Sequence, residues 1–159
     1  MRRKDREVTD PQEIARIVDT AKILHLGLFD EGYPYVVPLH YGYEWCDGQL
    51  FLYLHCAREG HKLDLIACNP HVTAEIECDV ELVSGGDVAC SYGSTYASVI
   101  ARGTAALVDD PHEKAHALEL LMQHQTGRTF TFNERMTSAV AVVRISVDSL
   151  TAKSRPKMG

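Results

Sequence analysis

Six apolar segments, rich in β-branched and aromatic residues and separated by short runs of turn residues, place the strongest constraint on this chain. Segments of this length and composition are typical of β-strands. Hairpins join most neighbours in the series, and neither a G-x-G-x-x-G nor a Walker motif is present. The predicted strands span residues 23–29, 33–43, 49–55, 72–77, 96–108 and 139–147. The sequence therefore predicts a mainly β fold, an antiparallel β-barrel with short helices rather than a Rossmann sheet.

Three short helices are expected at the connections between strands. Asp10-Pro11 and Asp110-Pro111 each place a capping Asp before a Pro, and Pro suits the first helical position. Glu13 completes a capping-box pattern with Asp10. The first helix is expected to end near residue 21, the second to run from about 61 to 69, and the third to end at 127. Residues 128–138 are interpreted as a loop.

The segment 33–43 carries two prolines, Pro34 and Pro38. Proline has no backbone N–H to give to a strand ladder, so it is confined to sheet edges and bulges. This strand is therefore expected to bend, or to leave one side of its backbone unpaired. Unpaired backbone near His40 can hydrogen-bond a flat heterocyclic ligand.

Basic side chains crowd the corner where the strand 49–55 gives way to a helix. His55, Arg58, His61 and Lys62 all lie within eight residues of one another, with Gly60 closing the turn. A helix N-terminus offers unpaired N–H groups and a partial positive charge, which favours a bound phosphate or carboxylate. The sequence thus indicates an anion site, and the alternative is a solvated basic turn.

One domain spanning residues 1–159 is expected, because this length suits a single domain and allows a sizeable core. Residues 1–9 and 154–159 are interpreted as a flexible arm and a flexible tail. The net charge of -6 argues against nucleic-acid binding. An anionic ligand therefore needs a local basic pocket.

The five cysteines are scattered and none forms a C-x-x-C pair, which indicates reduced thiols and a cytoplasmic location. The basic start is followed by no apolar run, so it does not read as a signal peptide. No apolar run approaches the length needed to span a membrane. We expect a cytoplasmic protein with neither membrane nor nucleic-acid partners.

Three segments together resemble the FMN-binding split-barrel proteins, the superfamily of pyridoxamine-phosphate oxidases. They are Tyr35-Val36-Val37-Pro38-Leu39-His40-Tyr41, then Leu52-Tyr53-Leu54-His55 through Gly60-His61-Lys62, then Tyr96-Ala97-Ser98-Val99-Ile100 through Gly103. Within the superfamily the chain is most similar to the nitroimidazole-resistance (nitroimidazole reductase-like) branch. The resemblance implies a six-stranded antiparallel split barrel that works as a homodimer, with FMN at the dimer interface. FMN is expected in preference to FAD.

The resemblance also implies the site residues. The strand from Val37 through Pro38, Leu39 and His40 to Tyr41 lines the isoalloxazine ring, partly through its main chain. The turn from His55 and Cys56 to His61 and Lys62 takes the ribityl phosphate, with Lys62 at the basic position. Ser98 and Val99 match positions on a strand that faces the cofactor. No counterpart of the oxidases' C-terminal substrate-binding segment is found, so pyridoxamine phosphate oxidation is not predicted.

His55 matches a histidine in the active site of the nitroimidazole-resistance branch and is the predicted catalytic residue, because imidazole titrates near neutral pH. The alternative is a strand-end histidine that hydrogen-bonds backbone. Likewise, Cys56 is interpreted as a packing thiol, and Lys62 is otherwise a solvated helix residue. No metal site is predicted, since His112 and His116 share a helix face but have no third ligand at a convincing spacing.

The resulting functional prediction is an FMN-dependent oxidoreductase. A nicotinamide cofactor would supply the electrons, and a small electron-poor molecule such as a nitroimidazole-like nitro compound would accept them. One alternative is a flavin carrier or sensor without a dedicated substrate. Another is a haem-binding split barrel in which His40 or His55 ligates the iron.

Overall fold

The computed structural model describes residues 3–155. These residues form seven strands, four α-helices and two 3-10 turns, the latter at Lys4–Arg6 and Ala89–Ser91. The strands are β1 (Glu7–Val8), β2 (Ile23–Phe29), β3 (Pro34–Cys46), β4 (Gln49–Cys56), β5 (His71–Val83), β6 (Gly93–Leu107) and β7 (Ala141–Arg155). The helices are α1 (Pro11–Thr20), α2 (His61–Cys68), α3 (Pro111–Thr126) and α4 (Glu134–Thr137).

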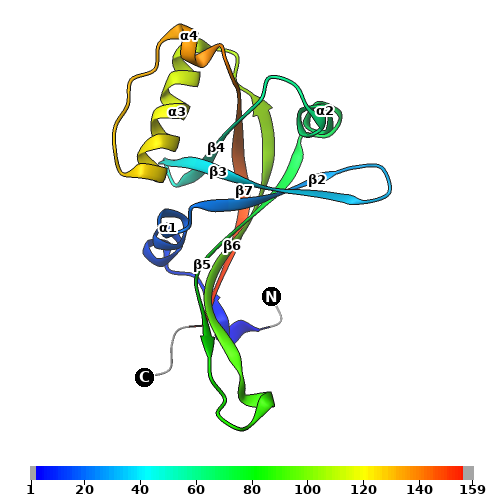
Figure 1. Ribbon diagram of the computed structural model, residues 1–159, viewed down its shortest axis with the longest axis vertical. Coiled ribbons are helices and arrows are strands. Elements are labelled where there is room, and N and C mark those ends of the chain that lie inside the picture. Colours follow the sequence, from blue (N-terminus) through cyan, green and yellow to red (C-terminus); the bar gives the residue numbers. More distant parts are fainter. Residues whose placement is uncertain (1–2, 156–159) are drawn as a thin grey trace.

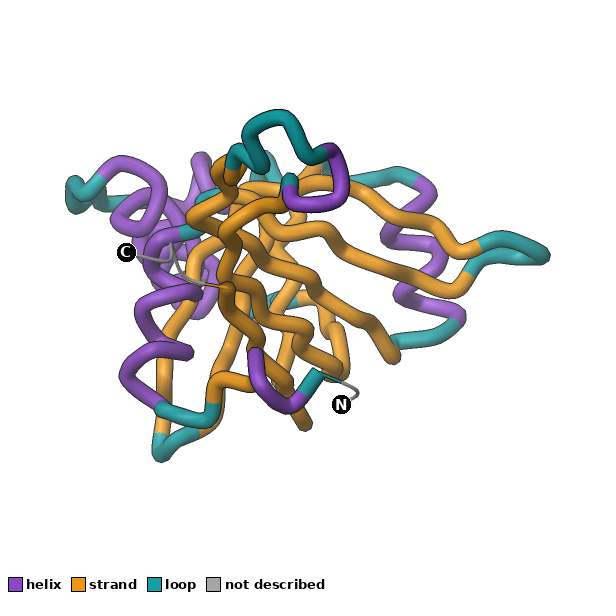
Figure 2. Tube along the Cα trace, turned by 90° about the horizontal axis from the view of Figure 1, so that it is seen from below, coloured by secondary structure: helices purple, strands orange, loops and turns teal. Residues whose placement is uncertain are grey.

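All the strands belong to one antiparallel sheet in the order β1-β7-β4-β3-β2-β5-β6, and a further ladder joins β6 to β7. That ladder closes β2 to β7 into a barrel, and the helices lie at its periphery (Figures 1 and 2). The prediction of a mainly β, antiparallel fold is confirmed. The strand count differs from the predicted six because Glu7 and Val8 pair with Lys153 and Ala152 at the far end of β7.

The chain ends depart from the sequence prediction. A 3-10 turn and β1 occupy residues 4–8, so the expectation of a flexible arm is wrong there. Strand β7 continues to Arg155, so the predicted tail does not begin at residue 154. The rest of the predicted arm and tail, residues 1–2 and 156–159, lies outside the described residues.

Within the region read as a loop, residues 128–138, the short helix α4 forms. Asn133 caps it by accepting a hydrogen bond from the Met136 N–H at 3.0 Å.

The core fills the barrel with the inward-facing residues of each strand. Leu24, Leu26 and Leu28 alternate inward along β2, and Ile17 and Val18 of α1 close one end. All five side chains are at least 96% buried. Burying such a side chain contributes about 1.5–3 kcal/mol, so this alternation fixes which face of each strand points outward.

Strand β3 changes partner along its length, and this change opens the barrel wall. Residues 34–40 pair with β2, whereas residues 41–46 pair with β4. In the described part of the chain, residues 34–40 therefore have no strand on their second side. Pro38 lies in this half, opposite His25 of β2. The prediction that the two prolines leave one side of the strand unpaired is confirmed, and the gap between β3 and β4 is called the split below.

The predicted helix starts are confirmed, with one correction. Asp10 accepts a hydrogen bond from the Gln12 N–H at 3.0 Å, and Asp110 accepts from the N–H groups of two residues in α3. Glu13, however, does not complete a capping box: its carboxylate accepts from Nε and Nη2 of the Arg16 guanidinium, each at 2.9 Å. An ion pair one turn along the helix has replaced the reciprocal cap.

Candidate functional site

The split brings two histidines together on the outside of the barrel. The ladder between β3 and β4 ends at Tyr41 opposite Leu54, so the next residues, His40 and His55, face each other across the strands as they diverge. Residues opposite each other in a ladder point to the same face. Both side chains are exposed. The structure thus places His40 of the proline-containing strand beside His55 of the basic corner.

The surroundings of His55 lower the pKa of its imidazole and so favour the neutral form. The protein around its ring lowers its pKa by desolvation, and the neighbouring His40 imidazole lowers it further. The backbone of His55 pairs with Val142 of β7, so one ladder fixes the position of the residue while its other side borders the split. A neutral imidazole at this place can accept or donate one proton, which is what the predicted catalytic role requires.

The start of α2 has the features of an anion site. Gly60 adopts a φ of 147°, a conformation that suits glycine, and its carbonyl accepts from the N–H groups of Leu63 and Asp64. Within residues 3–155 the N–H groups of His61 and Lys62 have no hydrogen-bond acceptor. Two free N–H groups beside the Lys62 ammonium form a suitable binding point for a phosphate.

The other polar residues of this corner have separate roles. His61 donates from Nε2 to the Asp30 carboxylate at 2.8 Å, and its ring meets the Tyr35 ring edge-on. Arg58 is exposed and makes no contact of this kind within the described chain. Cys56 is partly buried and packs against the core, and this burial raises the pKa of its thiol. The interpretation of Cys56 as a packing thiol therefore agrees with its environment.

The remaining predicted contacts divide between the two faces of the barrel wall. Val37 and Leu39 pack against the core, and Tyr41 is fully buried. Pro38 is exposed, like His40. The inward residues of β3 can therefore meet a ligand in the split only through their main chain, and that part of the prediction stays untested.

The two predicted contacts on β6 also differ from each other. Val99 is fully buried and points into the core, so its side chain cannot meet a ligand outside the barrel. Ser98 points outward and lies opposite Lys153 of β7. A small cavity of about 230 Å³ is lined by Ser98, Ile100, Thr151 and Lys153. Ser98 is therefore the member of this pair that can contact a ligand.

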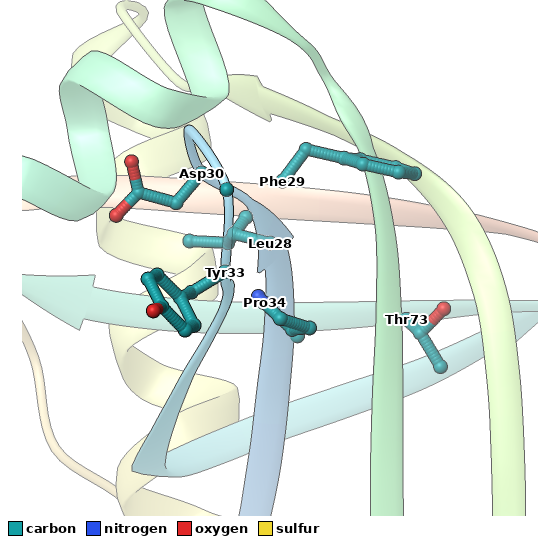
Figure 3. Close-up of a pocket in the computed structure, with 8 residues that line it drawn as sticks. Leu28, Phe29, Asp30, Tyr33, Pro34 and Thr73 are labelled. Carbon is teal, nitrogen blue, oxygen red and sulfur yellow. The ribbon is translucent and has the colours of Figure 1, made fainter.

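An apolar cavity of about 470 Å³ lies beneath the turn between β2 and β3. Figure 3 shows Phe29 and Asp30 pointing in opposite directions from this turn, with Thr73 contributed by β5. None of the predicted site residues lines the cavity, but Asp30 is the partner of His61. The cavity therefore adjoins the start of α2 and provides apolar surface next to the anion site.

Sequence reasoning missed two residues that shape the site. Asp30, in the turn between β2 and β3, accepts a hydrogen bond from His61 and holds its ring in place. Gln125, in the last turn of α3, accepts a hydrogen bond from His40 Nδ1 at 2.9 Å. The two partners are 85 residues apart in the chain. No local sequence signal links them, because only the packing of α3 against β3 brings them together.

Neither a metal cluster nor a membrane-spanning helix is found within the described residues. No three or more His, Cys, Asp or Glu side chains gather there in a way that could hold a metal ion. His116, which invited a metal reading, lies with Nε2 3.0 Å from the Glu44 carboxylate. None of the described helices combines the length and apolar character needed to cross a bilayer. All five cysteines are free thiols.

The barrel with its split defines the class of this protein as a small antiparallel split barrel with a gap in its wall. The sequence model of the family described as pyridoxamine 5'-phosphate oxidase matches residues 10–154. The chain belongs to this family, and the family prediction is confirmed. No curated protein matches the chain.

Solved structures extend the comparison. A candidate 5-nitroimidazole antibiotic resistance protein from Bacteroides thetaiotaomicron is 34% identical, with a TM-score of 0.79, over 93% of this chain and 86% of that one. The flavocytochrome Anf3 from Azotobacter vinelandii is 21% identical, with a TM-score of 0.79, over 99% of this chain and 72% of that one. An FAD- and heme-binding protein from Mycobacterium smegmatis is 16% identical, with a TM-score of 0.78, over 97% of this chain and 77% of that one. At these lower identities the last two establish a shared fold.

Proposed function

We propose that this protein is an FMN-dependent oxidoreductase. It takes electrons from a nicotinamide cofactor and passes them to a small electron-poor compound, such as a nitroimidazole-like nitro compound. The similarity over most of the chain to a candidate 5-nitroimidazole resistance protein favours this substrate class. The two flavin-containing relatives named above favour a flavin cofactor.

The observation that carries the proposal is the composition of the split. Residues 34–40 have one unpaired backbone edge, which carries the exposed imidazole of His40 and faces that of His55, and the start of α2 offers free N–H groups and Lys62. An unpaired strand edge suits the hydrogen-bonding rim of an isoalloxazine ring, and a helix start suits a phosphate. FMN, when bound, supplies the hydride and electron transfer chemistry. The residues of the chain would bind the cofactor, orient it and exchange protons at the two imidazoles.

A second copy of the chain would complete the site, and we propose a homodimer. Ser98 lies on the outer surface of β6, with β5 and β2 between it and β3. Three strand spacings amount to about 14 Å. A ligand in the split of one chain therefore reaches a Ser98 side chain most directly when a partner supplies it.

The first test is the visible absorption spectrum of the purified protein, with the released cofactor identified by mass. A flavin spectrum that yields FMN is expected, together with nicotinamide-dependent reduction of a 5-nitroimidazole. Lys62→Ala should weaken FMN binding roughly 10- to 100-fold, because a hydrogen bond to a charged group contributes about 1.5–3 kcal/mol. Lys114→Ala, on α3 away from the split, is the matched control and should bind FMN like the wild type. A colourless protein that takes up no added FMN would contradict the proposal.

The same measurements separate the alternative functions. Two adjacent exposed imidazoles at the split also suit a haem iron, so a Soret band in place of the flavin spectrum would favour the haem-binding alternative. Bound FMN without any turnover with NADH or NADPH would favour a flavin carrier or sensor.

A further inference from the structure

Gln125 is held in one orientation by three hydrogen bonds at the end of α3. Its side-chain amide nitrogen donates to the carbonyl oxygens of Lys22 at 3.1 Å and Tyr41 at 2.9 Å. Carbonyl oxygens only accept, so the NH₂ group must face them. The amide oxygen then points at His40, whose Nδ1 lies 2.9 Å away. The orientation of this amide is therefore determined by its surroundings.

This orientation determines the tautomer of His40. Its Nδ1 faces the Gln125 amide oxygen at 2.9 Å and the Lys22 carbonyl oxygen at 3.3 Å, and both of these atoms are acceptors. Nδ1 must therefore carry the proton. In a neutral imidazole the other nitrogen, Nε2, is then a hydrogen-bond acceptor. The His40 side chain is exposed, and its Nε2 has no hydrogen-bond partner within residues 3–155.

The charged and titratable groups around His40 leave this acceptor available. His55 lies across the split on β4, and partial desolvation and the neighbouring His40 favour its neutral form. The Lys22 ammonium binds the carbonyl oxygens of Asp19 at 3.2 Å and His124 at 2.8 Å, so it is engaged elsewhere. A ligand in the split therefore meets a fixed acceptor on β3 beside the imidazole of β4.

We propose that Gln125 is a positioning residue that holds His40 in its Nδ1–H tautomer. His40 Nε2 then accepts a hydrogen bond from an N–H or O–H group of the small molecule bound in the split. The identity of that molecule rests on the proposed function, but the tautomer does not. Gln125 acts through His40 and need not touch the ligand.

The tautomer is tested on the protein with ¹⁵N-labelled histidine by two-dimensional imidazole NMR. The wild type should show a protonated Nδ1 and an unprotonated Nε2 at His40. Gln125→Leu leaves only the more distant Lys22 carbonyl oxygen as an acceptor for Nδ1, so it should weaken this preference and raise the population of the Nε2–H form. Gln125→Glu keeps an acceptor for Nδ1–H, so the tautomer should persist. Gln123→Leu, two residues away on the same helix, is the control and should leave the spectrum unchanged.

The functional consequence is tested on the FMN-loaded protein. Gln125→Leu should weaken FMN binding or raise the KM for a 5-nitroimidazole roughly 3- to 10-fold, as loss of one hydrogen bond predicts. Gln123→Leu should change neither value, and circular dichroism should show that all variants are folded. An unchanged His40 tautomer in Gln125→Leu, or unchanged FMN affinity and KM, would overturn the inference while leaving the proposed function standing. Absence of flavin from the wild type would overturn the proposed function, and the tautomer result would still be decisive for Gln125.

Discussion

Among single residues, Tyr41 connects the barrel core to the end of α1. Its hydroxyl donates toward the carbonyl oxygens of Val18 at 2.7 Å and Ala21 at 3.1 Å, and the side chain is fully buried. Tyr41→Phe would leave a buried carbonyl without its donor. We expect the free energy of unfolding to fall by about 1–3 kcal/mol, measured by urea denaturation.

The matched control for Tyr41 is Tyr33→Phe. The Tyr33 side chain is 82% exposed and makes no hydrogen bond in the described chain. Such a surface change should alter stability by less than about 0.5 kcal/mol. Equal effects of the two substitutions would mean that the buried hydroxyl contributes nothing beyond the ring.

The sequence could point to a site residue where the features that mark it lie close together in the chain. Lys62 and His55 were found because the strand end, the glycine and the helix start that surround them are consecutive in the chain. Gln125 and Asp30 were missed because each acts on a histidine far away in sequence. Val99 was assigned to the cofactor, yet its alternation with Ser98 on β6 puts it in the core. A one-residue step along a strand exchanges the two faces, and the sequence resemblance did not separate them.

Among the elements, α3 packs very closely on β3 at Gly42. A Cβ atom at this position would overlap the backbone of Leu121. Gly42→Ala should therefore push α3 away from the barrel and lower the free energy of unfolding by about 1–3 kcal/mol. Gly27→Ala is the control within β2, since its Cβ would lie at an ordinary 3.4 Å from the Thr73 carbonyl oxygen. Thermal denaturation of both variants measures the effect. An unchanged melting temperature in Gly42→Ala would contradict the close approach of α3 to β3.

The end of α3 also makes stability depend on pH through His124. This ring donates from Nε2 to the Ala21 carbonyl oxygen at 2.8 Å, and its buried Nδ1 has no hydrogen-bond partner, with the Asp19 carboxylate 4.0 Å away. Burial lowers the pKa of His124, and the nearby Lys22 ammonium lowers it further. The unfolded chain, with an ordinary histidine pKa of about 6.5, therefore binds a proton at a higher pH than the folded chain does. The free energy of unfolding should therefore be independent of the titration of His124 above about pH 6.5, and it should fall as the pH decreases below that value.

Urea denaturation at pH 7.5 and at pH 5.5 measures this dependence. The loss at the lower pH should be smaller in His124→Gln, because glutamine does not titrate. A pH dependence equal to that of the wild type would show that His124 is not its source.

Strand and helix boundaries follow from sequence where the signals are local. Strand β2 matches its prediction, Ile23–Phe29, and α3 ends where Gly127 adopts a φ of 70°. Strands β5 and β7 run several residues beyond their predicted ends, because β6 pairs with them along a long twisted ladder. The pairing of β1 with β7 joins residues at opposite ends of the chain. Such pairing depends on the folded barrel, so no window of sequence could reveal it.

At the scale of the whole molecule, the proposed homodimer explains the exposed apolar residues on the barrel wall. Val36 on β3 is 58% exposed and Ile100 on β6 is 42% exposed. Ile100 also lines the small cavity with Ser98, the residue proposed to reach the site of the partner. A stable interface buries about 800 Å² on each partner, which a broad sheet face can provide. The dimer would thus cover these residues and complete two ligand sites at once.

Ile100→Lys tests this arrangement with little risk to the fold, because the new ammonium lies opposite Glu75 of β5 in the ladder. Burying that charge in an interface is costly, so the variant should become monomeric in analytical ultracentrifugation, whereas the wild type sediments as a dimer. The monomer should also bind FMN more weakly, since each site would lack the partner's Ser98. Met136→Lys, at a half-exposed position on α4, is the control and should remain dimeric. A monomeric wild type that binds FMN would mean that one chain forms the whole site, and Ser98 would then have no part in it.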